Sequence, residues 1–266
     1  MSLAHELESL AIDIAQDAGE LARMRRREGV AIAATKSALA DIVTLADREV
    51  EALIRARLAE ARPGDGFLGE ETGAERGSTD VTWVVDPIDG TVNYAYGNPL
   101  YAVSVAAVIG EPVAGEWEAV AAAVYAPALD ETFHAARGAG AWLGDERIVV
   151  NAEVSAAGAL LGTGFGYDPA THAGDLARVS RVMPMARDLR RGGAASLDLA
   201  YVASGRLDGY FERGLAPWDH AAGALLVTEA GGSFGFVASD DSAPRPLIVA
   251  ATPVIFERLL DTALAD

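Results

Sequence analysis

Two aspartates three residues apart, with a proline between them, are the residues of this chain best suited to chemistry. The segment Asp86-Pro87-Ile88-Asp89-Gly90-Thr91 follows Val81–Val85, whose β-branched and aromatic residues predict a strand. Two neighbouring carboxylates ionise at little cost only when a cation lies between them. Pro87 restrains this link, and we expect Gly90 and Thr91 to begin a short helix whose free N–H groups bind phosphate oxygens. The segment predicts a metal-plus-phosphate site, although a capped aspartate-rich turn would have the same sequence.

Further acidic residues stand in segments that could complete such a site. The pair Glu70-Glu71 follows a predicted strand, Gly66–Leu68, and is otherwise an ordinary exposed acidic pair. Asp219 begins a predicted helix, where a helix N-cap is the competing interpretation. Four polar residues precede or begin another predicted helix, and Thr44 or Asp47 could equally be its cap: Lys36, Asp41, Thr44 and Asp47. Together these side chains supply the hard oxygen ligands that a site for two or three Mg²⁺ ions requires.

Composition narrows the class of protein. The 266 residues carry a formal net charge of −18, and 51% of them are apolar. So acidic a chain repels phosphate backbones and anionic lipids, and we expect neither a nucleic-acid nor a membrane partner. Bound metal ions would still admit a small phosphorylated substrate. Without cysteine, the chain has no disulfide, thiolate ligand or cysteine nucleophile. The start lacks a signal-peptide layout and apolar runs such as 101–109 are too short to span a bilayer, so we expect a cytoplasmic protein.

Hydrophobic spacing places these segments on helices and strands. The expected helices are Leu3–Arg27, Asp47–Ala61, Thr171–Met183, Ala195–Ala203, Trp218–Ala230 and Pro253–Leu264. The expected strands are Gly66–Leu68, Val81–Val85, Leu100–Ile109, Ala119–Ala126, Thr132–Ala136, Ala141–Leu143, Leu160–Phe165, Ala186–Arg190, Leu207–Phe211 and Leu247–Ala251. The middle strands indicate a largely antiparallel sheet, and the later alternation indicates a layered α/β arrangement. We therefore expect an α/β (α+β) protein with an N-terminal α+β half, residues 1–150, and a C-terminal α/β half, residues 151–266.

Three other patterns favour structural roles over chemistry. The run Gly162-Thr163-Gly164-Phe165-Gly166 lacks the spacing of a dinucleotide-binding loop, and we expect it to be a packing feature at a strand end. The four histidines have no zinc-hydrolase arrangement, and the sequence has no G-x-S-x-G elbow. A group of arginines is expected to be the solvated end of the first helix: Arg23, Arg25, Arg26 and Arg27.

Taken in order, the motifs resemble the inositol monophosphatase family, within the larger group of magnesium-dependent, lithium-sensitive phosphatases. Residues 83–94 resemble the family's first signature, and residues 218–223 with 229–232 resemble the second. Other segments match the family's order and approximate spacing: Lys36, Asp41–Thr44, Asp47, Gly69–Glu71, Gly192–Ala195 and Asp208–Glu212. The resemblance covers nearly the whole chain. It implies a layered α-β-α-β-α sandwich of the inositol monophosphatase and fructose-1,6-bisphosphatase type, with the site between the halves, and a homodimer.

The resemblance also implies a role for individual residues. The implied metal ligands are Glu70, Asp86, the carbonyl of Ile88, Asp89 and Asp219. Asp86 would bridge two Mg²⁺ ions, and a third, weaker ion would lie near Glu70. Thr91, hydrogen-bonded to Asp47, would orient and help deprotonate the attacking water. The catalytic residues implied are Thr91, Asp47, Glu70 and Lys36.

Substrate contacts follow from the same resemblance. The amides of Gly90 and Thr91 would bind the phosphate. The alcohol side would be lined by Asp89, Gly193, Ala195, Glu212 and Asp219. Most metal ligands would thus come from the N-terminal half, and Asp219 with most of the alcohol contacts from the C-terminal half.

Within the family, the identity of the alcohol is the open point. Val92 stands where histidinol-phosphate phosphatases often carry lysine, and Glu212 is placed to receive hydroxyls, so we expect inositol 1-phosphate as substrate. Histidinol phosphate, fructose 1,6-bisphosphate and 3′-phosphoadenosine 5′-phosphate are the alternatives. Some bacterial members are linked to transcription complexes, so a regulatory binding protein on the same fold is a further alternative. The complete set of site residues favours an enzyme.

Overall fold

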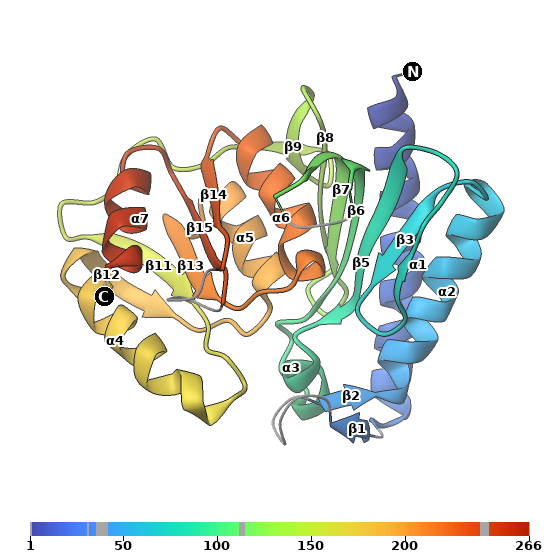
Figure 1. Ribbon diagram of the computed structural model, residues 1–266, viewed down its shortest axis with the longest axis horizontal. Helices are drawn as coiled ribbons and strands as arrows, with labels where there is room; N and C mark the ends of the chain where they lie inside the picture. The colour runs from blue at the N-terminus through green and yellow to red at the C-terminus, as the bar shows by residue number, and fades with distance from the viewer. Residues whose placement is uncertain (1, 31, 36–41, 112–114, 240–244, 266) are drawn as a thin grey trace.

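Two large β-sheets and three sets of helices alternate in space in the computed structural model (Figure 1). The structure describes residues 2–30, 32–35, 42–111, 115–239 and 245–265. The main helices are α1 (Leu3–Glu28), α2 (Leu45–Ala61), α4 (His172–Val182), α5 (Ala195–Ala203), α6 (Pro217–Glu229) and α7 (Phe256–Leu264). Helices α1 and α2 cover one face of the first sheet, α5 and α6 lie between the sheets, and α4 and α7 cover the outer face of the second. This α-β-α-β-α layering confirms the predicted fold class.

The first sheet has eight strands in the order β10-β9-β8-β7-β6-β5-β3-β4. Their bounds are β3 (Gly66–Gly69), β4 (Gly73–Glu75), β5 (Val81–Asp89), β6 (Ala102–Gly110), β7 (Trp117–Ala126), β8 (Glu131–Ala136), β9 (Gly140–Leu143) and β10 (Glu146–Ile148). All neighbours pair antiparallel except β3 and β5, which are parallel. The predicted antiparallel sheet is confirmed, and the short strands β4 and β10 are additions to it.

The second sheet has five strands in the order β12-β11-β13-β15-β14. Their bounds are β11 (Ala159–Thr163), β12 (Ala186–Arg190), β13 (Gly209–Arg213), β14 (Ser233–Val237) and β15 (Leu247–Ala251). Strand β11 runs parallel to β12 and β13, whereas β15 is antiparallel to β13 and β14. Strand β14 was not predicted. The remaining elements are β1 (Ile32–Thr35), β2 (Ile42–Thr44), α3 (Thr91–Tyr96) and the 3-10 turns η1 (Pro169–Thr171) and η2 (Met183–Met185).

Burial explains the character of each helix layer. Helix α1 is amphipathic, with buried residues such as Leu7, Ile14 and Ala18 at helical spacing against the first sheet. Helices α5 and α6 are apolar over most of their surface because they are packed between two sheets, and most of their residues are buried. The loops at the ends of these two central helices are therefore held between the sheets, beside the end of β5. None of the described helices is long and apolar enough to cross a membrane.

Candidate functional site

Strand β5 carries the two aspartates that the sequence analysis singled out. The predicted end of this strand at Val85 is wrong, since β5 continues through Asp89 and pairs with β6 at Asp86 and again at Asp89. The pairing is irregular between these residues, where Pro87 has no N–H to donate. The Ile88 amide donates instead to Asp86 Oδ1 at 3.0 Å. Both aspartates are buried, so their carboxylates are held on a bent strand rather than on a free turn.

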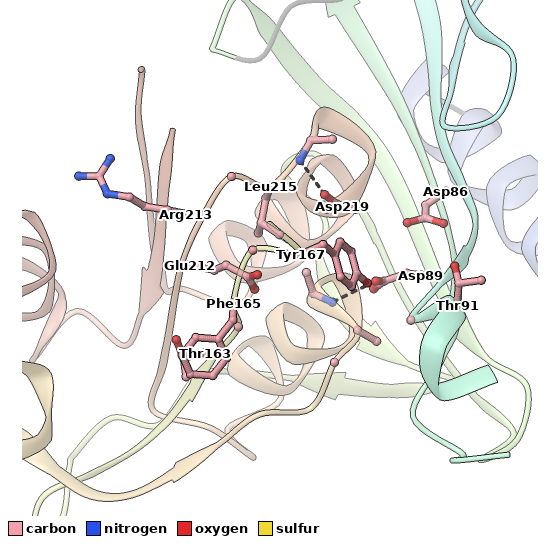
Figure 2. Close-up of a pocket in the computed structure, with 18 of the residues that line it drawn as sticks. Asp86, Asp89, Thr91, Thr163, Phe165, Tyr167, Glu212, Arg213, Leu215 and Asp219 are labelled. Carbon is pink, nitrogen blue, oxygen red and sulfur yellow. Dashed lines mark hydrogen bonds between the residues drawn. The ribbon is translucent and has the colours of Figure 1, made fainter. Parts of the chain in front are cut away.

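Asp219 joins this pair from a distant part of the chain. One carboxylate oxygen from each of Asp86, Asp89 and Asp219 lies within 4.8 Å of the others, and Figure 2 shows the three side chains converging, with Glu212 set apart from them. Asp219 lies in the first turn of α6, and its Oδ2 accepts a hydrogen bond of 2.6 Å from the Ala216 amide. The N-cap of α6 is Ala216, so the interpretation of Asp219 as the N-cap is wrong. Asp219 is the third residue of the helix, and its carboxylate accepts from the N-cap amide while it also belongs to the acidic cluster.

The electrostatics of this cluster favour a bound cation. Burial raises the pKa of Asp86 well above its ordinary value, and the negative charges of Glu70, Asp89 and Asp219 raise it further. Burial and the charge of Asp89 likewise raise the pKa of Asp219. Carboxylates that repel one another in a buried site ionise readily once a divalent cation lies between them. Oxygen-only donors are the ligands that Mg²⁺ prefers, so the residues present fit that ion.

Glu70 and the Ile88 carbonyl lie beside the three aspartates. Glu70 follows β3 directly and lines a cavity that Asp86, Asp89 and Asp219 also line. Its charge and its hydrogen bond to Asp86 both contribute to the raised pKa of Asp86. The interpretation of Glu70 as an ordinary surface residue is therefore wrong. The Ile88 carbonyl oxygen accepts a hydrogen bond of 3.1 Å from the Thr91 hydroxyl. The structure thus gathers all five predicted metal ligands at one end of β5.

Asp47 approaches the site from α2. Its Oδ1 lies 3.2 Å from the Thr91 hydroxyl, and its Oδ2 accepts from the Thr44 amide at 2.8 Å and from the Thr44 hydroxyl. Thr44, one of the two residues predicted as a possible cap, is the N-cap of α2, and Asp47 forms a capping box with it. The carboxylate that caps the helix therefore also faces the site. Burial raises the pKa of Asp47 to about 6. Lys36 and Asp41, the other residues predicted in this part of the chain, lie outside the described residues.

Beyond the aspartates the cavity, of about 410 Å³, opens toward the second sheet. Gly90, Thr91, Gly193, Ala195 and Glu212 all line it, as the sequence analysis expected of substrate contacts. Gly90 has φ of +85°, and a Cβ there would lie 3.0 Å from the carbonyl oxygens of Leu100 and Gly193, which explains why glycine stands before α3. Burial raises the pKa of Glu212 to about 7, although the Tyr210 hydroxyl donates a hydrogen bond to its carboxylate.

Two features of this cavity were missed from sequence. The glycine run at the end of β11 is a packing feature, as predicted, but residues 163–166 of it also line the cavity. A Cβ on Gly164 would lie 2.0 Å from Glu212 Oε2. Ser196 donates to Asp89, although nothing in the sequence pairs these two residues. The position of the glycine run at the end of a predicted strand was a usable signal. The contact between Ser196 and Asp89 depends on how α5 packs against β5, and no sequence signal could have predicted it.

Comparison with known proteins agrees with this geometry. Residues 3–264 match the model of the inositol monophosphatase family. The chain belongs to this family. The inositol-1-monophosphatase SuhB of Mycobacterium tuberculosis is 42% identical over 96% of this chain and 92% of its own length. The Nus factor SuhB of Pseudomonas aeruginosa is 40% identical over 96% and 94%. The crystal structure of the extragenic suppressor protein suhB from Bartonella henselae has a TM-score of 0.85 at 34% identity, covering 97% of this chain and 98% of that one.

Membership of the inositol monophosphatase family fixes the chemistry at a coarse level. The family consists of metal-dependent phosphatases, and the three-aspartate cluster is an arrangement that could bind such a metal. A phosphate monoester is consistent with the family as the class of substrate. A relative named as an inositol-1-monophosphatase and one named as a Nus factor have nearly the same sequence identity to this chain, 42% and 40%. The specific activity therefore has to be argued from the site itself.

Proposed function

We propose that the protein is a Mg²⁺-dependent phosphatase that hydrolyses inositol 1-phosphate to inositol and phosphate. The observation that carries the proposal is the contact between Thr91 and Asp47 at the edge of the three-aspartate cluster. That contact supplies a hydroxyl with a proton acceptor behind it, next to ligands for a hard cation. The inositol-1-monophosphatases among the relatives support the choice of substrate.

Two or three Mg²⁺ ions would be held by Glu70, Asp86, the Ile88 carbonyl, Asp89 and Asp219. When bound, they would offset the charge of the phosphate and lower the pKa of a coordinated water. The protein's own contribution is to keep these oxygens close together and buried before the ions arrive. Without this arrangement, an acidic cavity would repel a phosphate monoester.

Thr91 and Asp47 would handle the proton of the attacking water. The single proton of the Thr91 hydroxyl can be donated to the Ile88 carbonyl oxygen at 3.1 Å or to Asp47 Oδ1 at 3.2 Å. When it is donated to Asp47, the oxygen lone pairs of Thr91 can accept a hydrogen bond from water. As the water attacks phosphorus, its proton would pass to Thr91 while the Thr91 proton passes to Asp47. The bond from phosphorus to the inositol oxygen would break at the same time, and that oxygen would leave as an alkoxide that takes a proton from solvent water. A carboxyl whose pKa is raised to about 6 is a better proton acceptor near neutral pH than an ordinary aspartate.

The two ends of the substrate would meet different walls of the cavity. At the start of α3, the amides of Gly90 and Thr91 have no acceptor inside the helix and would bind phosphate oxygens. The alcohol would face Gly193, Ala195 and Glu212, with Asp89 and Asp219 between the two ends. Glu212 offers acceptor oxygens for hydroxyl groups, which suits a polyol such as inositol. The cavity volume of about 410 Å³ is within the range for small-molecule sites.

A substrate panel tests this proposal. Initial rates would be measured for inositol 1-phosphate, histidinol phosphate and fructose 1,6-bisphosphate, with Mg²⁺ and with EDTA. We expect inositol 1-phosphate to give the highest kcat/KM, EDTA to abolish turnover, and lithium to inhibit by replacing one magnesium. Turnover that survives chelation would contradict the metal mechanism. Faster hydrolysis of histidinol phosphate or of fructose 1,6-bisphosphate would contradict the inositol assignment alone and point to that alternative.

The similarity to the Pseudomonas aeruginosa Nus factor SuhB favours a second candidate, a regulatory binding protein on the same fold. Asp89→Asn separates the two, because it removes a proposed metal ligand that a purely binding function would not need. Both chains would be expressed in Pseudomonas aeruginosa lacking its own Nus factor. Complementation by wild type and by Asp89→Asn alike would support the binding function, and complementation by neither would count against it.

We also propose that the protein is a homodimer, as the family resemblance implies. Light scattering after size exclusion should give twice the mass of one chain. A mass of one chain at micromolar concentration would contradict this.

A further inference from the structure

The carboxylate of Asp89 is held by three donors from the start of α5. The Ala195 amide donates to Oδ1 at 3.1 Å. The Ser196 amide and the Ser196 hydroxyl donate to Oδ2 at 2.7 and 2.5 Å. Asp89 and Ser196 are both buried, at 6% and 0% exposure, so water cannot replace these contacts easily. The orientation of Asp89 therefore depends on a helix from the other side of the site.

The Asp89 carboxylate also caps the N-terminus of α5. The N-cap residue of α5 is Ala194, whose side chain has no oxygen to accept the free amides of the first turn. Asp89, which is 106 residues before Ala195 in the chain, supplies that oxygen and places its negative charge at the positive end of the helix. The two amides would be present whatever residue followed Ala195. The Ser196 hydroxyl is the one donor of the three that the side chain determines.

The other two aspartates of the cluster are held differently. Asp86 accepts from the Ile88 amide, and Asp219 accepts from the Ala216 amide, each within three residues along the chain. The orientation of Asp219 is thus set within its own helix, and that of Asp86 by its own strand and by its hydrogen bond with Glu70. Asp89 instead takes its orientation from α5, and Ala195 of the same helix lines the alcohol side of the cavity. The start of α5 therefore touches both the candidate metal cluster and the candidate alcohol site.

We propose that Ser196 is a positioning residue of the metal site, whose hydroxyl fixes the Asp89 carboxylate in the orientation that the ion needs. Donors to a ligating carboxylate orient it, and removing one typically weakens metal binding by about 10- to 100-fold. The Ser196 amide and hydroxyl together occupy Oδ2 and the Ala195 amide occupies one side of Oδ1, so the other side of Oδ1 is left to accept the ion. This inference rests on the proposed metal-dependent function in that Asp89 must bind the ion.

Ser196→Ala tests the proposal, because it removes the hydroxyl and adds no bulk. The readout is the apparent Mg²⁺ affinity of the substrate-free protein, obtained from the rise of Tm with Mg²⁺ concentration. We expect affinity to fall by about tenfold. The matched control is Ser204→Ala at the other end of α5, where the hydroxyl donates to the Ala200 carbonyl at 2.9 Å. Its Mg²⁺ affinity should equal that of wild type.

Two further measurements distinguish positioning from a general loss of structure. Ser196→Thr keeps a hydroxyl and should bind Mg²⁺ more tightly than Ser196→Ala. In turnover, Ser196→Ala should need about tenfold more Mg²⁺ for half-maximal rate, with KM for the phosphate monoester at saturating Mg²⁺ changed by less than about twofold. The Tm in EDTA shows separately how far the metal-free fold has changed.

Unchanged Mg²⁺ affinity in Ser196→Ala would overturn the proposal, as would a Ser196→Thr variant no better than alanine. The proposed function can fail independently. If wild type binds Mg²⁺ but does not hydrolyse inositol 1-phosphate, the substrate assignment is wrong, while the Ser196 effect on Mg²⁺ affinity remains measurable.

Discussion

The Thr91 hydroxyl lies 3.2 Å from Asp47 Oδ1, although the two residues are 44 positions apart and on different helices. Thr91 is the first residue of α3, and Asp47 is in the first turn of α2. Thr44 donates both of its hydrogen bonds to Asp47 Oδ2, so Oδ1 is the oxygen that faces Thr91. Asp47, which takes part in the capping box of α2, therefore also contacts a residue of the candidate active site.

Thr91→Ala should lower kcat by about 10²- to 10⁴-fold, because the proposed proton acceptor of the attacking water is lost. KM for inositol 1-phosphate should change little. Steady-state rates at saturating Mg²⁺ are the measurement, and Thr228→Ala on α6, whose hydroxyl donates to the Ala224 carbonyl, is the matched control. A Thr91→Ala enzyme with at least half the wild-type kcat would rule out this role.

Asp86→Asn should make the metal-free protein more stable and the Mg²⁺ response weaker. The substitution removes one of several buried carboxylates that repel one another, while an amide oxygen can still accept from the Ile88 amide. Thermal melts in EDTA and in Mg²⁺ would show a higher Tm than wild type in EDTA and a smaller rise with Mg²⁺. The opposite order in EDTA would mean that the cluster is not strained without metal.

Glu212→Gln should reduce kcat/KM for inositol 1-phosphate by about 10- to 100-fold, since a hydrogen bond to a charged acceptor contributes about 1.5–3 kcal/mol. Hydrolysis of p-nitrophenyl phosphate, which has no hydroxyls on its leaving group, should change by less than about threefold. Equal losses on both substrates would show that Glu212 acts on the chemistry rather than on the alcohol.

Gly164→Ala should disturb Glu212, because the new Cβ would lie 2.0 Å from Glu212 Oε2. Overpacking of this kind typically costs about 1–3 kcal/mol in unfolding free energy. Selectivity for inositol 1-phosphate over p-nitrophenyl phosphate should fall with it. Gly174→Ala on α4 is the control, because a Cβ there meets no heavy atom within 4 Å and alanine favours the helix by about 1 kcal/mol. Denaturant melts and the two-substrate assay decide the outcome.

The ion pair between His134 and Glu8 should make stability depend on pH far from the active site. Burial alone would lower the pKa of His134, but hydrogen bonds to Glu8 and to the Gly144 carbonyl outweigh it, and the pKa is raised. A raised folded-state pKa means that the contribution is complete below the unfolded value of about 6.5 and is lost as the pH rises through the folded value.

The measurement is the unfolding free energy of wild type and His134→Gln, in EDTA, between about pH 5.5 and about pH 8.5. The difference between the two proteins should shrink as the pH rises. A difference that stays constant over this range would contradict the assignment.

Sequence periodicity was sufficient for most helices and strands and for the residues held by local geometry, whereas the α-β-α-β-α layering was predicted from the family resemblance. A helix cap at Thr44 or Asp47 and the short helix after Gly90 were both predicted from adjacent residues. Strands β4 and β10 were missed because they have only three residues each, too few to show a period. Strand β5 was predicted too short because an aspartate and a proline usually end strands, whereas here β6 continues the pairing.

Contacts between residues far apart in the chain could not be predicted from the sequence pattern alone. The hydrogen bonds of Ser196 to Asp89 and the packing of Gly164 against Glu212 depend on how the two sheets are brought together. The grouping of Asp86, Asp89 and Asp219 was predicted because a family resemblance linked motifs that spacing alone could not. The division at residue 150 and the catalytic role of Lys36 stay predictions.

The acidic cluster has a consequence for the newly made chain. Asp86 and Asp89 leave the ribosome well before Ser196 and Asp219, which hold or complete their site. Until those later residues have been synthesised, the nascent protein has Glu70, Asp86 and Asp89 but not the full set of proposed ligands. Metal loading and enzymatic competence should therefore begin together, late in synthesis, and a truncated translation product lacking α6 would be inert rather than partly active.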